Sequence, residues 1–441
     1  MEDRIVVVGG GSMGAGIAAV ARAASYDVVL VEPDPAARER AGKRAAGVTL
    51  AASVPADERV EIAIEAVPER LDLKQAIFAT MAAALPKAVL ATNTSSLPVS
   101  EIAKAAPQRG IGMHFFNPPE KMRLVEIVRT DASARSAVEA ARAFVQRIGK
   151  TAIVTADTPG FVVNRVARPY YLQSIDALHA GVGSIEALDR LARGIGFRMG
   201  PFELMDFIGL DVNLATSESV YERTRARRLR PREMQRALVA QGRLGRKSGA
   251  GFYDYGVAPP ARDAARPATA QRFPGGVACV ADGALRVELE ALGARGDDGE
   301  PDVVLADAYG FDLEACANGI RNPQRLVGVG IVGALADQRA VEIVALERTS
   351  SGALALARDA FERLGRDPID VANVPGLFLG RVVAAIVNEA RIAVREGVAG
   401  EEDVDSAMRL GTNYPHGPIA WGKSIGQERV AEILRVTDMS G

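Results

Sequence analysis

A histidine and a glutamate on consecutive apolar segments are well placed to move a proton. His114 lies at the end of the apolar stretch Gly110–Phe115, and Glu126 lies in the next one, Leu124–Arg129, across a proline turn. If these stretches are neighbouring strands, the two side chains face each other at the edge of the sheet. A carboxylate bound to one ring nitrogen fixes the tautomer and stabilises the imidazolium. An isolated histidine is more often a core residue, but Glu126 favours a general base, which hydride transfer from an alcohol requires.

A glycine-rich turn near the N-terminus predicts a dinucleotide site. The turn fits GxGxxG, follows an expected strand at residues 5–8 and opens an expected helix at residues 13–24. Such a turn brings the backbone close to a pyrophosphate, and the helix N-terminus offers free N–H groups. Glu32 ends the next expected strand, where a carboxylate binds a ribose hydroxyl and repels the 2′-phosphate of NADP. We therefore assign NAD to Gly9, Gly11, Ser12, Met13, Gly14 and Glu32.

These side chains need a sheet to position them, and the pattern predicts one of the α/β class. Strands expected at residues 60–67 and 88–93 bracket a helix that opens at Pro68, and a further helix is expected over residues 132–149. This alternation indicates a parallel sheet with helices on both faces, as in a Rossmann-type domain. From Pro159 onward the pattern becomes helical.

Composition excludes several classes of protein. The chain of 441 residues carries 53 Lys and Arg against 55 Asp and Glu, so its net charge of −2 gives no field that would gather nucleic acid. Two cysteines, Cys279 and Cys316, form neither a disulfide framework nor a zinc site, and we predict no metal. No window approaches the roughly 18 apolar residues of a membrane span. We expect a cytoplasmic protein that binds neither nucleic acid nor a membrane.

The second half of the chain repeats the first. Arg325 stands 216 positions after Arg109, and the motif Val125-Glu-Ile-Val128 recurs at the same offset as Val341-Glu-Ile-Val344. The second copy has no GxGxxG, and glycines stand where the first copy has side chains: Gly330 for His114 and Gly380 for Asn164 at the same offset, and Gly310 for Ser95 at an offset of 215. Only the glutamate persists, as Glu342. We predict that this copy is degenerate and binds no cofactor.

Several motifs together resemble the L-3-hydroxyacyl-CoA dehydrogenase family, across residues 1 to about 255 and weakly to 441. They are Asn93-Thr-Ser-Ser-Leu97, Gly112-Met-His-Phe-Phe-Asn-Pro118, Thr158-Pro-Gly-Phe-Val-Val-Asn-Arg165 and Gly245-Arg-Lys-Ser-Gly-Ala-Gly-Phe-Tyr253. The tandem arrangement is similar to bacterial forms that act on 3-hydroxybutyryl-CoA or 3-hydroxyadipyl-CoA in fatty acid or phenylacetate degradation.

The resemblance implies a role for each matching residue. His114 would be the base and Glu126 its partner, Ser95 would bond the reacting oxygen, and Asn164 would hold substrate and histidine. Taken alone, Ser95 reads as a loop or capping serine and Asn164 as a helix-start residue. Cofactor contacts near the nicotinamide ribose would also come from Glu69, Lys74 and Asn93. The implied partner is an acyl-CoA substrate.

One departure concerns the arm that follows Glu32. Only 27 residues separate Glu32 from the strand expected at residue 60, where the family inserts a long helical arm that touches CoA. Lys43 and Arg44 remain as phosphate partners, although a solvated helix face is the favoured interpretation. The short arm keeps a free hydroxy acid such as L-gulonate open as an alternative substrate. A silent dinucleotide-binding protein is the alternative from another class.

The expected domain organisation follows the repeat. Residues 1–157 form an NAD-binding Rossmann domain, 158–256 a helical domain, 257–275 a linker, 276–370 a degenerate Rossmann-like domain and 371–441 a second helical domain. The single-copy members of the resembled family pair through the helical domain. We therefore expect an intrachain pseudo-dimer of the helical domains, with a homodimer left open.

Overall fold

The computed structural model describes residues 3–256, 267–296, 300–309 and 312–437. The described chain divides into two compact units. One contains the residues up to Arg165 together with Ile392–Thr412, and the other contains Val166–Arg391 with the residues from Asn413. Part of the expected linker, residues 257–266, lies outside the described residues. Among the described residues, no helix has both the length and the apolar character to span a membrane.

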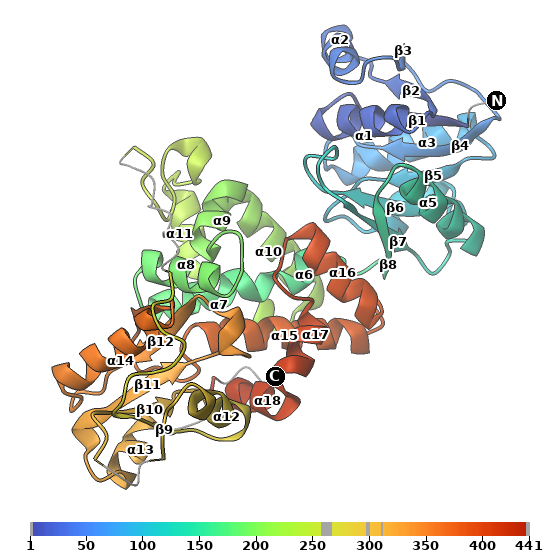
Figure 1. The fold of residues 1–441 in the computed structure, drawn as a ribbon. Helices are drawn as coiled ribbons and strands as arrows, with labels where there is room; N and C mark the ends of the chain where they lie inside the picture. Colours follow the sequence, from blue (N-terminus) through green and yellow to red (C-terminus); the bar gives the residue numbers. More distant parts are fainter. Residues whose placement is uncertain (1–2, 257–266, 297–299, 310–311, 438–441) are drawn as a thin grey trace. The chain divides into compact units, whose positions relative to one another are not determined.

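The first unit is built on an eight-stranded sheet, drawn in blue to teal in Figure 1. The strand order is β3-β2-β1-β4-β5-β6-β7-β8, so the order reverses between β1 and β4. The strands are β1 (Arg4–Val8), β2 (Asp27–Val31), β3 (Thr49–Ala51), β4 (Val60–Glu65), β5 (Val89–Thr92), β6 (Gly110–Phe115), β7 (Leu124–Arg129) and β8 (Thr151–Ala156). The helices are α1 (Ser12–Ala23), α2 (Pro35–Arg44), α3 (Leu71–Ala84), α4 (Val99–Ile102), α5 (Arg135–Arg147), α6 (Val163–Val166) and α16 (Glu401–Gly411), with the 3-10 turn η1 (Ala103–Ala105).

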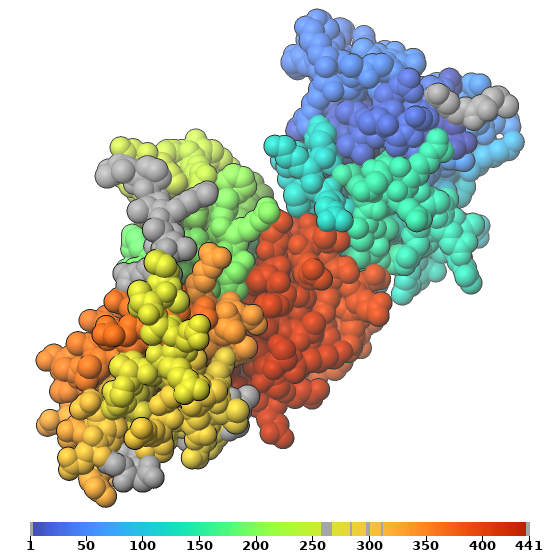
Figure 2. All heavy atoms as spheres, in the orientation of Figure 1, coloured from blue at the N-terminus to red at the C-terminus, as the bar shows by residue number. Residues whose placement is uncertain are grey.

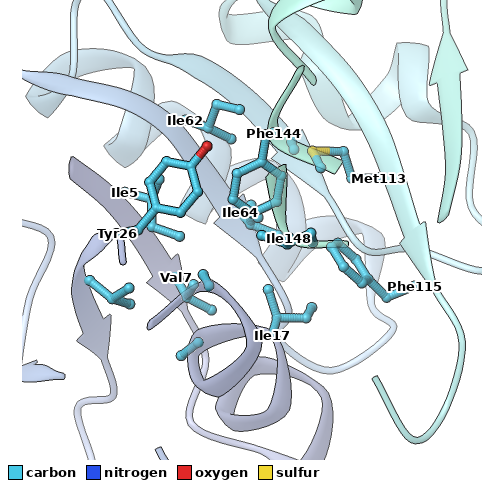
Figure 3. Packing of buried hydrophobic residues seen from close by; sticks show 14 of the residues in the cluster. Ile5, Val7, Ile17, Tyr26, Ile62, Ile64, Met113, Phe115, Phe144 and Ile148 are labelled. Atoms are coloured by element: carbon cyan, nitrogen blue, oxygen red, sulfur yellow. The ribbon is translucent and has the colours of Figure 1, made fainter. Parts of the chain in front are cut away.

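Alternating apolar side chains explain why helices cover both faces of this sheet. Ile5 and Val7 of β1 belong to one buried cluster, which includes Ile17 of α1 and Phe144 of α5 (Figure 3). The intervening Val6 and Val8 belong to a second cluster with residues of α3. A strand places successive side chains on opposite faces, so a run of apolar residues needs a cover on each. The result is the doubly wound Rossmann architecture that the sequence predicts.

Three details differ from the expectation. The sheet is mixed, because β7 runs antiparallel to β6. The expectation did not include β3 and β8. Helix α3 begins at Leu71 and not at Pro68, since Arg70 is still extended (φ −130°) and residues 66–70 form a loop at the end of β4. The proline marks this loop instead of the first helical turn.

The second unit holds the helical region of the first copy and most of the second copy (Figures 1 and 2). In Figure 2 its green and orange segments, which come from the first and the second copy, lie side by side. The first helical region contains α7 (Arg168–His179), α8 (Ile185–Gly194), α9 (Pro201–Ile208), α10 (Leu210–Thr224), η2 (Arg227–Leu229), α11 (Glu233–Ala240) and η3 (Arg246–Ser248). The second contributes α15 (Leu379–Arg395, counted here to Arg391), α17 (Pro418–Ile425) and α18 (Gln427–Val436).

The second sheet has the order β13-β12-β11-β10-β9. Its elements are β9 (Val277–Val280), α12 (Gly283–Ala291), β10 (Val303–Asp307), α13 (Leu313–Gly319), η4 (Pro323–Arg325), β11 (Leu326–Gly330), η5 (Leu335–Asp337), β12 (Ala340–Val344), α14 (Ser351–Arg363) and β13 (Asp367–Asp370). β11 and β12 are antiparallel, as β6 and β7 are. By the repeat offset, β9 to β13 correspond to β4 to β8. Among the described residues, the second copy therefore has no counterpart of β1, β2 and β3.

Each sheet is completed by a helix from the other copy. In the first unit α16, from the second copy, packs on β7 and β8, and the N–H of Ala156 donates to the carbonyl of Val398 at 2.8 Å. In the second unit α8, from the first copy, packs on β12 and β13, and the N–H of Ala372 donates to Val182 at 2.9 Å. Both bonds join the same two repeat positions, 216 residues apart, so the exchange is reciprocal.

The two helical regions also contact each other within the second unit. Phe197 lies against Tyr414 with ring centroids 4.9 Å apart, and the Arg228 guanidinium binds Glu389 at 2.6 Å. Tyr414 and Phe197 are both buried. These contacts bury apolar side chains from both repeats in one core.

Candidate functional site

The glycine turn after β1 has the geometry of a pyrophosphate-binding loop. Gly9 has φ +110°, and a Cβ on it would lie 2.7 Å from the carbonyl oxygen of Ala66. A Cβ on Gly14 would lie 1.9 Å from the carbonyl oxygen of Gly9, so this close approach also requires glycine. By contrast, nothing lies within 4 Å of a Cβ on Gly11, the residue that precedes α1. The N-terminus of α1 therefore faces open space, where backbone N–H groups can meet an anion.

Glu32 follows β2 and closes the other side of the loop. Its Oε2 accepts from the N–H of Gly10 at 2.8 Å, and its Oε1 accepts from the N–H of Asp34 at 3.1 Å. The carboxylate is thus held in one place while each oxygen keeps a lone pair for a further donor. This position suits recognition of a ribose hydroxyl.

A cavity of about 940 Å³ joins these groups. It lies where the strand order reverses between β1 and β4, the position at which doubly wound sheets bind dinucleotides. Its lining includes Gly9, Gly11, Ser12, Met13 and Glu32. A close-packed glycine turn, an open helix N-terminus and a fixed carboxylate are the groups that NAD needs at its pyrophosphate and adenosine ribose.

Arg44, at the end of α2, also reaches this cavity. Its Nη1 donates to Ser12 Oγ at 3.0 Å, and its Nη2 binds Glu120 Oε1 at 2.7 Å. Lys43 is exposed and pairs with Glu39 on the same helix at 2.8 Å. Both Lys43 and Arg44 are exposed, as expected for a solvated helix face, and Arg44 in addition contacts Ser12 and Glu120.

His114 and Glu126 are directly opposite each other on β6 and β7. His114 Nδ1 lies 2.6 Å from Glu126 Oε2, and both side chains are buried. The expected place at the edge of the sheet is wrong, because β8 extends the sheet beyond β7. The pair lies instead within the sheet, near the carboxyl end of β6. With Nδ1 engaged, Nε2 is the nitrogen that can take a proton.

The second oxygen of Glu126 is bound as well. Oε1 accepts from the N–H groups of Val162 and Val163 at 3.1 and 3.0 Å. The preceding Phe161 adopts a left-handed conformation (φ +48°), which costs a residue other than glycine about 1–3 kcal/mol. This turn aims two donors at one oxygen, so the carboxylate cannot rotate away from the histidine.

Asn164 follows these two donors in α6 and connects them to Ser95. Its Nδ2 donates to the carbonyl oxygen of Ser95 at 3.4 Å. Ser95 itself is exposed in the loop after β5. His114, Glu126, Asn164 and Ser95 therefore form one connected set at the carboxyl ends of the strands. The Phe161 ring lies 5.7 Å from the imidazole and forms part of its apolar surroundings.

Glu69 and Lys74 lie beside this set, but they bind protein groups. Glu69 Oε1 accepts from Thr94 Oγ1 at 2.7 Å and from the N–H of Ser95 at 2.9 Å. Burial raises the pKa of Glu69, but Lys74 and these hydrogen bonds lower it more, so the net pKa is below its ordinary value. Lys74 is buried and contacts Glu69 at 3.3 Å. These contacts set the shape of the serine loop.

Two contacts at the strand ends complete this region. Glu65, the buried last residue of β4, binds Lys74 Nζ at 2.8 Å and accepts from Thr92 Oγ1 at 2.7 Å. The sequence analysis missed Glu65, although an acid that ends an apolar strand is a usable signal. Asn93 Oδ1 accepts from the N–H of Phe115 at 2.9 Å, which ties the end of β5 to the residue after His114. Within the described chain, no group of three or more metal-ligating side chains is present.

The equivalent place in the second copy is filled. Gly330 lies opposite Glu342 in the strand register, as His114 lies opposite Glu126. The Tyr309 hydroxyl donates to Glu342 Oε2. The Tyr309 ring packs on Gly380, where a Cβ would lie 2.9 Å from the nearest ring carbon. Burial raises the pKa of Glu342 to about 7, although hydrogen bonds from Tyr309 and two backbone N–H groups lower it. Gly310 lies outside the described residues, and the sequence analysis missed Tyr309.

Family models match most of the chain. The model described as "3-hydroxyacyl-CoA dehydrogenase, NAD binding domain" matches residues 4–54 and 37–158. The model of the C-terminal domain of the same family matches residues 160–255 and again 376–440. The second match of the C-terminal model coincides with the second helical region.

Named relatives are of two lengths. The 3-hydroxyadipyl-CoA dehydrogenase of Escherichia coli is 37% identical over 98% of this chain and 92% of that protein. A probable 3-hydroxybutyryl-CoA dehydrogenase of Bacillus subtilis is 37% identical over 57% of this chain and 97% of its own length. A crystal structure of 3-hydroxybutyryl-CoA dehydrogenase from Escherichia coli K12 has a TM-score of 0.85 at 34% identity, covering 99% of this chain and 94% of the other.

Proposed function

Because this chain belongs to the 3-hydroxyacyl-CoA dehydrogenase family, we propose that it oxidises an (S)-3-hydroxyacyl-CoA to the 3-ketoacyl-CoA with NAD as cofactor. The observation that carries the proposal is the connected set of His114, Glu126, Asn164 and Ser95 in the same unit as the glycine turn. This set holds a base at the carboxyl ends of the strands, where such folds bind their ligands.

Each residue has a defined task in this proposal. Asn164 and Ser95 orient the C3 hydroxyl, and His114 Nε2 removes its proton. Glu126 stabilises the imidazolium that forms, since its other oxygen is held by backbone donors. A positioned base of this kind contributes about 10²–10⁴ in rate. The bound nicotinamide supplies the acceptor for the hydride that leaves C3.

The pathway and the acyl group are the finer part of the proposal. We assign the reaction to fatty acid β-oxidation or to phenylacetate-type degradation. The name of the full-length Escherichia coli relative, a 3-hydroxyadipyl-CoA dehydrogenase, supports an acyl-CoA substrate with a carboxylate at its far end. The single-copy relative named for 3-hydroxybutyryl-CoA supports a short acyl chain.

A substrate panel tests the proposal. The purified protein is mixed with NAD and with (S)-3-hydroxybutyryl-CoA, its (R) isomer, 3-hydroxyadipyl-CoA or free L-gulonate, and NADH absorbance is followed. We expect NADH from the (S)-acyl-CoA substrates alone. NADH from the free hydroxy acid alone would favour the alternative substrate class. No NADH from any substrate, with tight NADH binding, would favour a silent dinucleotide-binding protein.

A further inference from the structure

One segment of the second copy, Ile392–Thr412, belongs to the first unit and packs directly against the candidate active site. In the segment Ile392–Thr412, Asp403 Oδ2 accepts from the N–H of Val154 on β8 at 3.3 Å. At its other end, a Cβ on Gly411 would lie 2.8 Å from Leu124 of β7 and 3.0 Å from Val163 of α6. The segment therefore touches both the strand that carries Glu126 and the short helix that carries Asn164.

An ion pair links this segment to the residue after Asn164. Arg165 Nη1 lies 2.7 Å from Glu396 Oε2, with the arginine side chain 3% exposed and the glutamate 53% exposed. The N–H of Arg165 donates to the carbonyl of Gly160 at 3.2 Å. A guanidinium held out of water needs a fixed charge partner, and its position fixes the short helix that bears it.

The repeat supplies an internal comparison. Arg381 occupies the position of Arg165 in the second copy, and its Nη2 donates to the carbonyl of Pro375 at 3.1 Å. The position equivalent to Glu396 is Ala180, and the position equivalent to Asn164 is Gly380. The arginine is thus present in both copies, as Arg165 and Arg381. The glutamate that contacts it is present only for Arg165, the arginine that follows Asn164. Arg381 also interacts electrostatically with an acid of the other copy, Asp176, but that carboxylate binds Arg232 at 2.6 Å. The direct ion pair with Glu396 is made by Arg165, in the copy that has the asparagine.

We propose that Glu396, a residue of the second copy, is a positioning residue for the active site of the first. It holds Arg165 and thereby α6, which presents the N–H of Val163 to Glu126 and the Asn164 side chain to Ser95. The kinetic part of this inference rests on the proposed function. A small misplacement of groups that orient a substrate lowers the rate strongly, by up to about 10²-fold.

The test compares Glu396→Ala and Glu396→Gln with a matched control in the full-length protein. The control is Glu139→Ala, which removes a glutamate of similar exposure whose ion-pair partner, Arg135 (2.6 Å), is exposed on α5 of the same unit. Hydrogen exchange by mass spectrometry follows residues 160–167, and kinetics give kcat and the KM for acyl-CoA and NAD. We expect Glu396→Ala to speed exchange in this peptide and to lower kcat about tenfold, with the KM for NAD unchanged.

Glu396→Gln should recover most of both losses, because its amide oxygen still accepts from the guanidinium, and Glu139→Ala should change neither. Exchange and kcat that stay at wild-type values in Glu396→Ala, or that change equally in the control, would overturn the positioning role. If the wild type turns over no hydroxyacyl-CoA, the proposed function fails, but the exchange of residues 160–167 still decides whether Glu396 orders α6.

Discussion

At the scale of single residues, the Glu126 carboxylate is held on both sides. One oxygen meets His114 and the other meets two backbone N–H groups. An amide in its place has one acceptor and one donor end. If its oxygen keeps the backbone donors, its NH₂ group faces Nδ1, and the imidazole must then carry its proton on Nε2, the nitrogen that should act as base.

We therefore expect His114→Ala to abolish turnover and Glu126→Gln to lower kcat by about 10²–10⁴. Neither change touches the glycine turn, so NADH should bind both variants as it binds the wild type. Stopped-flow kinetics measure the turnover of both variants, and fluorescence titration measures their affinity for NADH. Full activity of the His114 variant would leave the proposed reaction without its base.

Glu32 sets the choice between NAD and NADP in the same residue-level terms. Loss of a charged hydrogen bond to a ribose hydroxyl costs about 1.5–3 kcal/mol, which is roughly 10- to 150-fold in affinity. Glu32→Ala should weaken NADH binding by that factor and NADPH binding far less, in parallel titrations. Glu39→Ala, which removes an exposed acid of α2, is the control and should change neither. A wild-type protein that prefers NADPH contradicts this assignment.

At the scale of elements, the described residues of the second copy form only the half of the sheet that corresponds to β4 to β8. Strands β9 to β13 match β4 to β8, and the described residues include no match for the strands that carry the glycine turn and Glu32. We therefore expect isothermal calorimetry to give one NAD site per chain. Two NAD sites per chain would contradict this prediction, because the second copy would then need a pyrophosphate-binding loop of its own.

In the second copy, Glu342 should make the free energy of unfolding depend on pH. The buried Glu342 has a pKa of about 7 against an ordinary value of 4.5, so the folded state favours the protonated acid. Stability from this group is complete below pH 4.5 and is lost as pH rises to about 7, on the order of 3 kcal/mol at about 1.4 kcal/mol per pH unit.

Glu342→Gln does not titrate and can still hydrogen-bond Tyr309. Its unfolding free energy relative to the wild type should therefore rise between pH 4.5 and pH 7 and then level off. Denaturant unfolding at several pH values measures this difference. A constant difference across the range would mean that Glu342 is charged in the folded protein at all of these pH values.

How much the sequence predicts depends on whether a feature is local. The glycine turn, Glu32 and the β6 and β7 strands follow from neighbouring residues, and the structure places them as expected. The contact between Arg44 and Glu120 was not predicted, because the two residues are 76 positions apart in the sequence. Tyr309, at the repeat position of Asn93, was missed because nothing next to it in the sequence indicates that its ring fills the site of the second copy. The antiparallel direction of β7 follows from the short turn after β6, because a parallel neighbour would need a crossover of a dozen or more residues.

At the scale of the whole chain, the reciprocal exchange predicts what a cut in the linker does. A fragment of residues 1–256 lacks Ile392–Thr412, which packs on β7 and β8 in the first unit. We expect it to aggregate or to pair with itself, as an uncovered apolar surface does, and to lose activity. Size-exclusion chromatography with light scattering gives its mass. A soluble, monomeric and fully active fragment would contradict the need for the second copy.

The same exchange sets the order in which the protein can be finished during synthesis. Asp403, which binds the backbone of β8, leaves the ribosome 249 residues after Val154. At roughly 5–20 residues per second, the outer strands of the catalytic sheet wait roughly 10–50 s for their cover. Contacts of such long sequence separation form late, and the waiting surface is open to chaperones and to neighbouring nascent chains. The second repeat, which is synthesised last, therefore completes the folding of the first.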